Sequence, residues 1–179
     1  LNKNIILNRK LEHPNTNNYL MLHFDEKWIF KDYLQTYMSI EPSNEINFFK
    51  FLETIISKSN SDLVITTGLI QNKYIDFLKN RSKFLSKNSY VLNIKNKKIF
   101  LYLDLSFLEL EKLILLSKTV ITCHGAPSHV ASALDKKIID IIDDSEKEFF
   151  IKWTSHFRNH HLIIRKNFEL ISNKILTLL

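Results

Sequence analysis

The sequence predicts a doubly wound α/β fold, in which a mostly parallel, Rossmann-like sheet carries helices on both faces. Short apolar runs rich in β-branched residues, such as residues 62–66 and 138–142, alternate with segments in which apolar residues recur at helical spacing. The loops between them are short, which favours parallel strands joined by crossover helices. Several runs are apolar along their whole length, as expected for strands that are covered on both faces.

The alternation predicts the order of the elements. The expected strands are residues 19–24, 62–66, 89–94, 99–103, 119–122, 138–142 and 161–164. The expected helices are residues 45–57, 72–80 and 106–117, and three more that begin near Pro127, Ser145 and Asn167. Residues 95–98 join two of the β-type runs as a hairpin would. We expect residues 1–18 to be a lead-in strand or linker and residues 19–179 to form a single domain.

Local signals predict where two helices begin. Ser106 with Glu109, and Ser145 with Glu148, have the spacing of a capping box, in which each side chain bonds the backbone amide of the other residue. The second box opens a segment whose aromatic residues recur along one side. We expect that side to pack into the core: Phe149, Phe150, Trp153 and Phe157.

The composition bounds the class of protein. The single cysteine, Cys123, excludes an internal disulfide and fits a reducing compartment, and we expect it to be buried and unreactive. No apolar run reaches the ~20 residues of a membrane span, and no signal-peptide pattern opens the chain. We therefore expect a cytoplasmic location, with the inner membrane surface as an alternative. Because the chain begins with Leu1, we also expect it to be a piece of a longer protein.

The charge balance is basic, with a formal net charge of +6. The lysines are spread along the chain, which indicates an ordinary solvated surface. The alternative is attraction to anionic partners, such as nucleotide phosphates or acidic lipid headgroups at a membrane. Lysine far outnumbers arginine, which argues against a dedicated nucleic-acid groove, so nucleic acid is not an expected partner.

The most informative stretch is residues 119–134, where a β-branched run turns through glycine into a helix. The chain contains two glycines, Gly68 and Gly125, and both follow β-type runs. In a chain so poor in glycine, we interpret both as positions where the backbone needs freedom or close approach. Pro127 suits the first helical turn because its missing N–H would be unpaired there. Such a turn presents backbone N–H groups and the positive end of the helix dipole, which together attract phosphate.

In doubly wound sheets, ligands bind beyond the carboxyl ends of the strands. That rule selects residues 23–28, 66–69, 103–107, 123–129 and 143–145. Both glycines fall in these segments, and so does a carboxylate pair, Asp25 and Glu26. Asp25 is a weak candidate for a catalytic base. The alternative is a solvated loop in which the two adjacent side chains diverge.

Residues 119–134, together with the helix-forming residues 110–114, resemble the C-terminal, donor-binding half of GT-B glycosyltransferases. The likeness is greatest to the heptosyltransferase-like family, glycosyltransferase family nine, in which a strand is followed by Asp-Ser/Thr-Gly-Pro-x-His-Leu-Ala-Ala-Ala-Leu. The matching residues are Gly125, His129, Ala131, Ala133 and Leu134. Cys123 and His124 replace the Asp-Ser/Thr pair, and the proline lies one place later. Lys27-Trp28 resembles the family's Lys-x-Trp without its spacer.

The resemblance implies a site for a nucleotide-diphosphate sugar, the donor substrate of a transferase in surface polysaccharide or glycolipid assembly. The base would lie near Phe107 and Glu109, and the diphosphate along residues 125–129 with Lys27 beside it. The implied substrate-binding residues are Lys27, Thr67, Gly68, Phe107, Glu109, His124, Gly125, Ala126, Pro127, Ser128 and His129. GT-B enzymes generally use no metal or other cofactor here, because the helix dipole and side chains stabilise the departing nucleotide.

The catalytic base and acceptor site of such enzymes belong to an N-terminal domain, which we expect this chain to lack. The chain alone is therefore expected to be inactive. Two other functions stay open: a non-catalytic nucleotide- or phosphate-binding module on the same fold, and a small phosphatase or hydrolase that uses His124 or Asp25. The sequence contains no Walker-type loop, GxSxG elbow or zinc spacing. His160 and His161 are adjacent on a strand and point to opposite faces, which makes them poor joint metal ligands.

Overall fold

The computed structural model describes residues 18–29, 39–70 and 72–179, so nearly all of the expected lead-in segment lies outside the described residues. The strands in this part of the chain are β1 (Tyr19–His23), β2 (Leu63–Thr66), β3 (Lys83–Ser86), β4 (Ser89–Ile94), β5 (Lys97–Tyr102), β6 (Ser117–Cys123), β7 (Lys137–Ile142) and β8 (His160–Ile164). The helices are the 3₁₀ turn η1 (Glu26–Trp28), α1 (Glu45–Ser59), α2 (Lys73–Lys79), α3 (Phe107–Leu116), α4 (Ala126–Ala133), α5 (Lys147–Trp153) and α6 (Phe168–Leu178).

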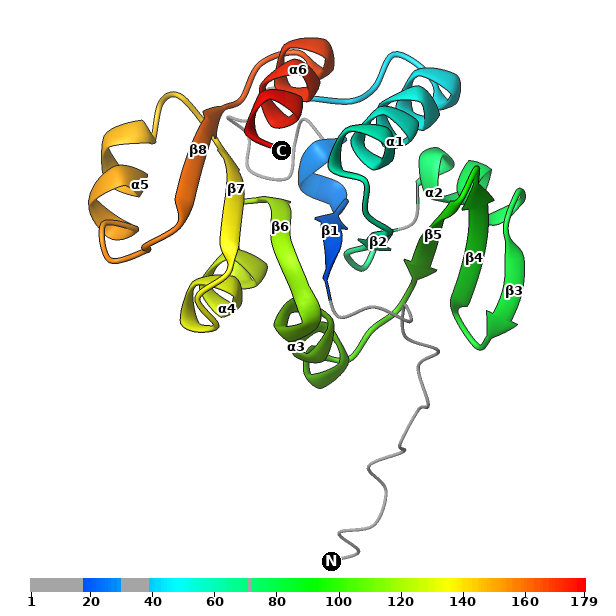
Figure 1. The fold of residues 1–179 in the computed structure, drawn as a ribbon. Helices are drawn as coiled ribbons and strands as arrows, with labels where there is room; N and C mark the ends of the chain where they lie inside the picture. Colours follow the sequence, from blue (N-terminus) through cyan, green and yellow to red (C-terminus); the bar gives the residue numbers. More distant parts are fainter. Residues whose placement is uncertain (1–17, 30–38, 71) are drawn as a thin grey trace, which may run out of the picture.

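β1 lies in the middle of one sheet, which runs in the order β3-β4-β5-β2-β1-β6-β7-β8 (Figure 1). The chain first extends the sheet to one side of β1, through β2 and β5, and then returns to the other side through β6, β7 and β8. All neighbours from β5 to β8 pair in parallel, whereas β3 and β4 run antiparallel to their neighbours. The predicted doubly wound fold is therefore confirmed. The strand order reverses between β1 and β6, which is where folds of this class bind ligands.

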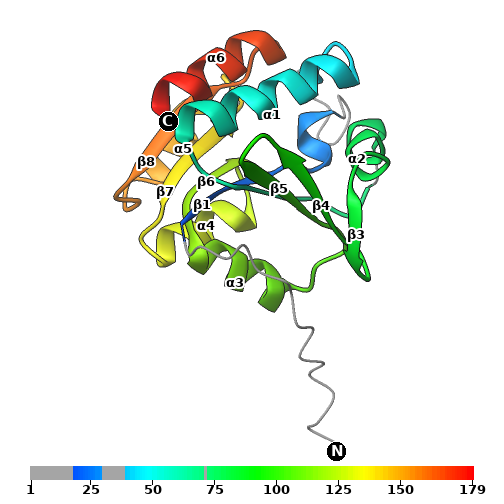
Figure 2. The ribbon, with the colours of Figure 1, turned by 45° about the vertical axis from the view of Figure 1, so that its right-hand side comes forward.

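Helices cover both faces of the sheet, with α1 and α6 on one side and α3 and α4 on the other (Figure 2). The side chains of β1 alternate between the two layers: Leu20 and Leu22 pack with the first, and Tyr19 and Met21 pack with the second. All four are buried. This double cover explains why the central strands are apolar along their whole length.

Two local predictions about α5 are wrong. Ser145 does not cap the helix, because its hydroxyl donates to Asp143 Oδ1 at 2.7 Å and the helix begins after Glu146. The expected aromatic side is also only half buried: Phe150 and Phe157 lie in the core, but Phe149 is 59% and Trp153 49% exposed. Residues 149 and 150 are adjacent and point about 100° apart on a helix, so one of them must turn away from the sheet.

The capping box of Ser106 and Glu109 is present at the start of α3, as the spacing predicts. The hairpin between β4 and β5 is also present, with Lys95 in a left-handed conformation at its turn. The edge strand β3 was not predicted. Its residues are exposed or only partly buried, so the segment lacks the apolar run by which the other strands can be recognised.

Candidate functional site

The 3₁₀ turn η1 follows β1 directly and projects side chains from the middle of the sheet's rim. Asp25 caps the turn, since its Oδ1 accepts the Lys27 amide at 3.2 Å. The fully buried Trp28 anchors it, because the indole N–H donates to the His23 carbonyl at 3.0 Å. β1 lies between β2 and β6, and the turn sends Glu26 toward the end of β2 and Lys27 toward the end of β6.

The two glycines lie where these side chains approach. A Cβ atom on Gly125 would collide with the Lys27 ammonium, and a Cβ atom on Gly68 would collide with the Glu26 carboxylate. Neither glycine lies in the left-handed region, since the φ of 169° at Gly125 is that of an extended backbone. Each is therefore needed for space and not for an unusual backbone conformation, in agreement with the close approach that the sequence suggested.

The turn from β6 into α4 offers fewer free amides than a phosphate-binding turn usually does. The His124 amide donates to the Ile141 carbonyl, and the Gly125 amide donates to the Ser128 hydroxyl at 3.3 Å. The Ser128 and His129 amides both donate to the Gly125 carbonyl, and Pro127 has no N–H. Among residues 124–129, all of which the structure describes, the Ala126 amide is left without a partner.

The positive charge at the turn comes from side chains as well as from the α4 dipole. The Lys27 ammonium donates to the His124 carbonyl at 2.8 Å, so it lies directly against the turn. Arg165, just after β8, is buried and donates to the Lys27 carbonyl at 2.6 Å and to Cys123 Sγ at 3.3 Å. With His124, these residues line a small pocket of about 10 Å³, enough for about one water molecule. Cys123 is buried as predicted, and burial raises the pKa of its thiol far above the ordinary value.

Asp25 and Glu26 are buried, 4% and 8% exposed, so the expectation of a solvated loop is wrong. The buried Trp28 holds the turn against the rim of the sheet, where Gly68 at the end of β2 lies close to both residues. Burial raises the pKa of Asp25 to about 6, although Lys27, 3.7 Å from its Oδ2, acts in the opposite direction. Burial and Lys27 lower the pKa of His23 to about 4. Glu26 Oε2 has no hydrogen-bond partner among the described residues.

A second carboxylate, Asp140 on β7, is completely buried and accepts three hydrogen bonds. Its Oδ2 lies 2.6 Å from His124 Nδ1 and 3.2 Å from His160 Nε2, and its Oδ1 accepts the Ser128 hydroxyl at 3.0 Å. Burial by itself would raise the pKa of Asp140, but the hydrogen bonds from the two histidines and Ser128 hold it below the ordinary value. This carboxylate ties the end of β6, the first turn of α4 and the start of β8 together.

The predicted site residues are divided among several places. Lys27, His124, Gly125, Ala126 and Ser128 meet at the turn into α4, where Pro127 is the second helical residue and buried. Thr67 and Gly68 line a separate cavity of about 310 Å³ at the ends of β2 and β5.

The other predicted residues, Phe107, Glu109 and His129, have their main contacts outside this group. Phe107 is 57% exposed at the start of α3, and the Glu109 carboxylate accepts the Ser106 amide and hydroxyl at 2.8 Å. The His129 ring packs against Trp153 and Phe157 and borders a cavity of about 380 Å³.

Three residues of this site were not among the sequence candidates: Asp140, His160 and Arg165. Asp140 carries a signal in retrospect, because it is the one charged residue in the apolar run 138–142. His160 was considered only as half of a metal-binding pair. Arg165 carries no local signal, since its role depends on β8 lying near β6 in the sheet.

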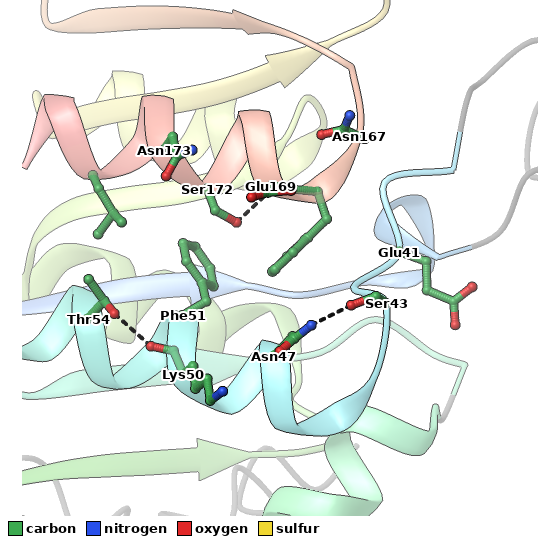
Figure 3. A pocket seen from close by; sticks show the side chains of 12 residues that line it. Glu41, Ser43, Asn47, Lys50, Phe51, Thr54, Asn167, Glu169, Ser172 and Asn173 are labelled. Carbon is green, nitrogen blue, oxygen red and sulfur yellow. Dashed lines mark hydrogen bonds between the residues drawn. The ribbon is translucent and has the colours of Figure 1, made fainter.

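A cavity of about 600 Å³ lies in the groove between α1 and α6, and none of the predicted site residues line it (Figure 3). Several of its polar side chains bond near neighbours: Asn47 donates to Ser43, Thr54 to the Lys50 carbonyl and Ser172 to the Phe168 carbonyl. These three groups already have hydrogen-bond partners. The charged residues of the lining, Glu41, Lys50 and Glu169, give the groove no excess of positive charge for a phosphate. We therefore place the candidate site at the strand-order reversal and not in the groove.

Two absences hold for the described part of the chain. No group of three or more His, Cys, Asp or Glu residues is arranged to hold a metal ion there. None of the described helices combines the length and the apolar character that a membrane crossing requires.

Comparison with known proteins shows the fold. No family model and no curated protein matches the chain. Among solved structures, it is similar to the UDP-GlcNAc 2-epimerase of Methanocaldococcus jannaschii, whose crystal structure is in complex with UDP-GlcNAc and UDP. The TM-score is 0.55 at 17% sequence identity, and the match covers 90% of this chain and 39% of the epimerase. The chain thus has a GT-B-like α/β fold and spans about two fifths of that neighbour's length.

Proposed function

We propose that this chain is the nucleotide-sugar-binding domain of a glycosyltransferase. One observation carries the proposal: the Lys27 ammonium lies on the strand–glycine–helix turn at the strand-order reversal. The turn combines a positive side chain, the free Ala126 amide and the N-terminal end of α4. A diphosphate is the ligand that such an arrangement favours.

The ligand would lie over the turn, because the small pocket beside Lys27 and His124 holds no more than a water. There the Lys27 ammonium can exchange its bond to the His124 carbonyl for one to a phosphate oxygen. Arg165 keeps the Lys27 backbone in place through the bond to its carbonyl. The epimerase of similar fold has UDP-GlcNAc and UDP bound, which supports a nucleotide sugar over a simple phosphate.

The finer features of the proposal follow the family resemblance. The enzyme would act in surface polysaccharide or glycolipid assembly, with the donor bound without a metal ion. The catalytic base and the acceptor site would come from a further domain. Lys27 and the α4 dipole would then stabilise the negative charge that develops on the departing nucleotide.

Titration of the protein with nucleotides tests the proposal. We expect UDP or another nucleoside diphosphate to bind and to raise the melting temperature in proportion to its affinity. Lys27→Met should raise the Kd by about tenfold or more, because a hydrogen bond to a charged group is lost. Lys58→Met, on the exposed end of α1, is the matched control and should bind normally. Absence of binding by all nucleoside diphosphates, or equal binding by the two variants, would overturn the proposal.

The alternative is a non-catalytic nucleotide-binding module. The carboxylates of the site, Asp25 and Asp140, are buried and hydrogen-bonded within the protein, which favours such a module over a hydrolase. Both functions predict that the protein binds nucleotides, so a test for a chemical reaction distinguishes them. Sugar transfer or slow nucleotide-sugar hydrolysis by the full-length protein supports the transferase. Binding without either reaction supports the module.

A further inference from the structure

The buried Asp140 carboxylate determines how the His124 ring presents its two nitrogens. A carboxylate only accepts hydrogen bonds, so the ring nitrogen 2.6 Å from Oδ2, Nδ1, must carry the shared proton. The other ring nitrogen, Nε2, is then the one left for a ligand. Ser128 and His160 hold the carboxylate from two further directions, which leaves it little freedom to turn.

The His124 side chain is only 7% exposed, and its Nε2 atom is buried without a hydrogen-bond partner among the described residues. Three rings pack near the His124 ring: Phe150 at 4.6 Å, His129 at 5.2 Å and Trp153 at 5.5 Å between ring centroids. A buried polar atom without a partner costs free energy, and a bound ligand is one reason to keep it. Trp153 is about half exposed, so one of the rings beside His124 is a surface side chain.

We propose that His124 Nε2 contacts a phosphate oxygen of the bound nucleotide and that Asp140 is the positioning residue that aims it. This inference rests on the proposed function. In the complex the ring carries both protons, with Nδ1–H donated to Asp140 and Nε2–H donated to phosphate. The Asp140 carboxylate then supplies the counter-charge of the imidazolium. Lys27 and His124 would hold the diphosphate from two sides of the same turn.

Two substitutions of His124 separate the roles of its nitrogens. His124→Asn keeps an amide near the position of Nδ1, so it can still bond Asp140, but it removes Nε2. We expect stability near that of the wild type and a Kd for UDP raised by about tenfold or more. His124→Gln places an amide near the position of Nε2 and loses the bond to Asp140. We expect a lower melting temperature and a smaller loss of UDP affinity.

Asp140→Asn tests the positioning role. In spectra of protein labelled with ¹⁵N-histidine, His124 of the wild type should show a protonated Nδ1, and its Nε2 signal should move on addition of UDP. Asp140→Asn should lower the fraction with a protonated Nδ1 and weaken UDP binding. If this variant does not fold, the two His124 variants still decide the question. His161→Asn and Asp144→Asn are matched controls outside the network and should bind UDP as the wild type does.

The outcomes distinguish this inference from the proposed function. Failure of the wild type to bind any nucleoside diphosphate refutes both. If Lys27→Met weakens UDP binding but His124→Asn and Asp140→Asn leave it unchanged, only the role of His124 is refuted. Variants that alter the melting temperature but not the Kd would show that the Asp140 network is structural.

Discussion

Replacement of Asp25 by asparagine should stabilise the protein at pH 7 and leave its stability unchanged near pH 4. The carboxyl has a pKa of about 6 in the folded protein against an ordinary 3.8, mainly because it is buried. The folded state therefore holds the proton more tightly than the unfolded state, so stability falls as the pH rises from about 4 to about 6. Since one pKa unit corresponds to about 1.4 kcal/mol, the burial of this charge costs about 3 kcal/mol above pH 6.

Asparagine removes the charge and keeps the cap, because its amide oxygen can accept the Lys27 amide as the carboxylate does. Urea unfolding followed by tryptophan fluorescence between pH 4 and 8 measures the effect, with the fully buried Trp28 as reporter. The difference between variant and wild type should be small near pH 4 and grow toward about 3 kcal/mol by pH 7. Asp144→Asn, at an exposed carboxylate, is the control and should show no such growth.

His23 provides a second test, because its pKa is lowered in the folded protein whereas that of Asp25 is raised. Its pKa is lowered from 6.5 to about 4, so its neutral form favours the fold and stability is lost as the pH falls through that range. In the wild type the two groups offset each other between pH 4 and 6. In Asp25→Asn the His23 effect remains alone, and stability should rise with pH there. Parallel stability curves for wild type and variant would refute the buried-charge argument.

Three further predictions follow from the site. Gly68→Ala should destabilise the fold by about 1–3 kcal/mol in urea unfolding, because the new Cβ meets the Glu26 carboxylate. The loss should shrink in a Glu26→Ala background, and an equal loss in both backgrounds would contradict the contact. Cys123 should react with a thiol reagent only after unfolding, because it is 1% exposed and burial raises its pKa; rapid labelling of the native protein would count against this. EDTA should leave the Kd for UDP unchanged, and a requirement for added Mg²⁺ would contradict the metal-independent site.

The sequence was sufficient for the elements whose signals are local. In the part of the chain that the structure describes, the apolar runs and helical spacings predicted seven of the strands and the six α-helices within a few residues, because each must present an apolar surface to the core. The Ser106–Glu109 box was confirmed, whereas Ser145 bonds Asp143 instead. Both boxes have the same spacing, so the choice depended on a neighbouring side chain that competes for the hydroxyl.

The sequence by itself determined that strands and helices alternate, that a strand turns through Gly125 into α4, and that polar residues follow the strands. The tertiary structure decided which of these residues meet. Lys27 and His124 are 97 positions apart and touch because the chain returns to place β6 beside β1. Asp140 and His124 meet because β7 pairs with β6. Strand order depends on how all the crossovers together cover the sheet, and no local pattern of residues encodes it.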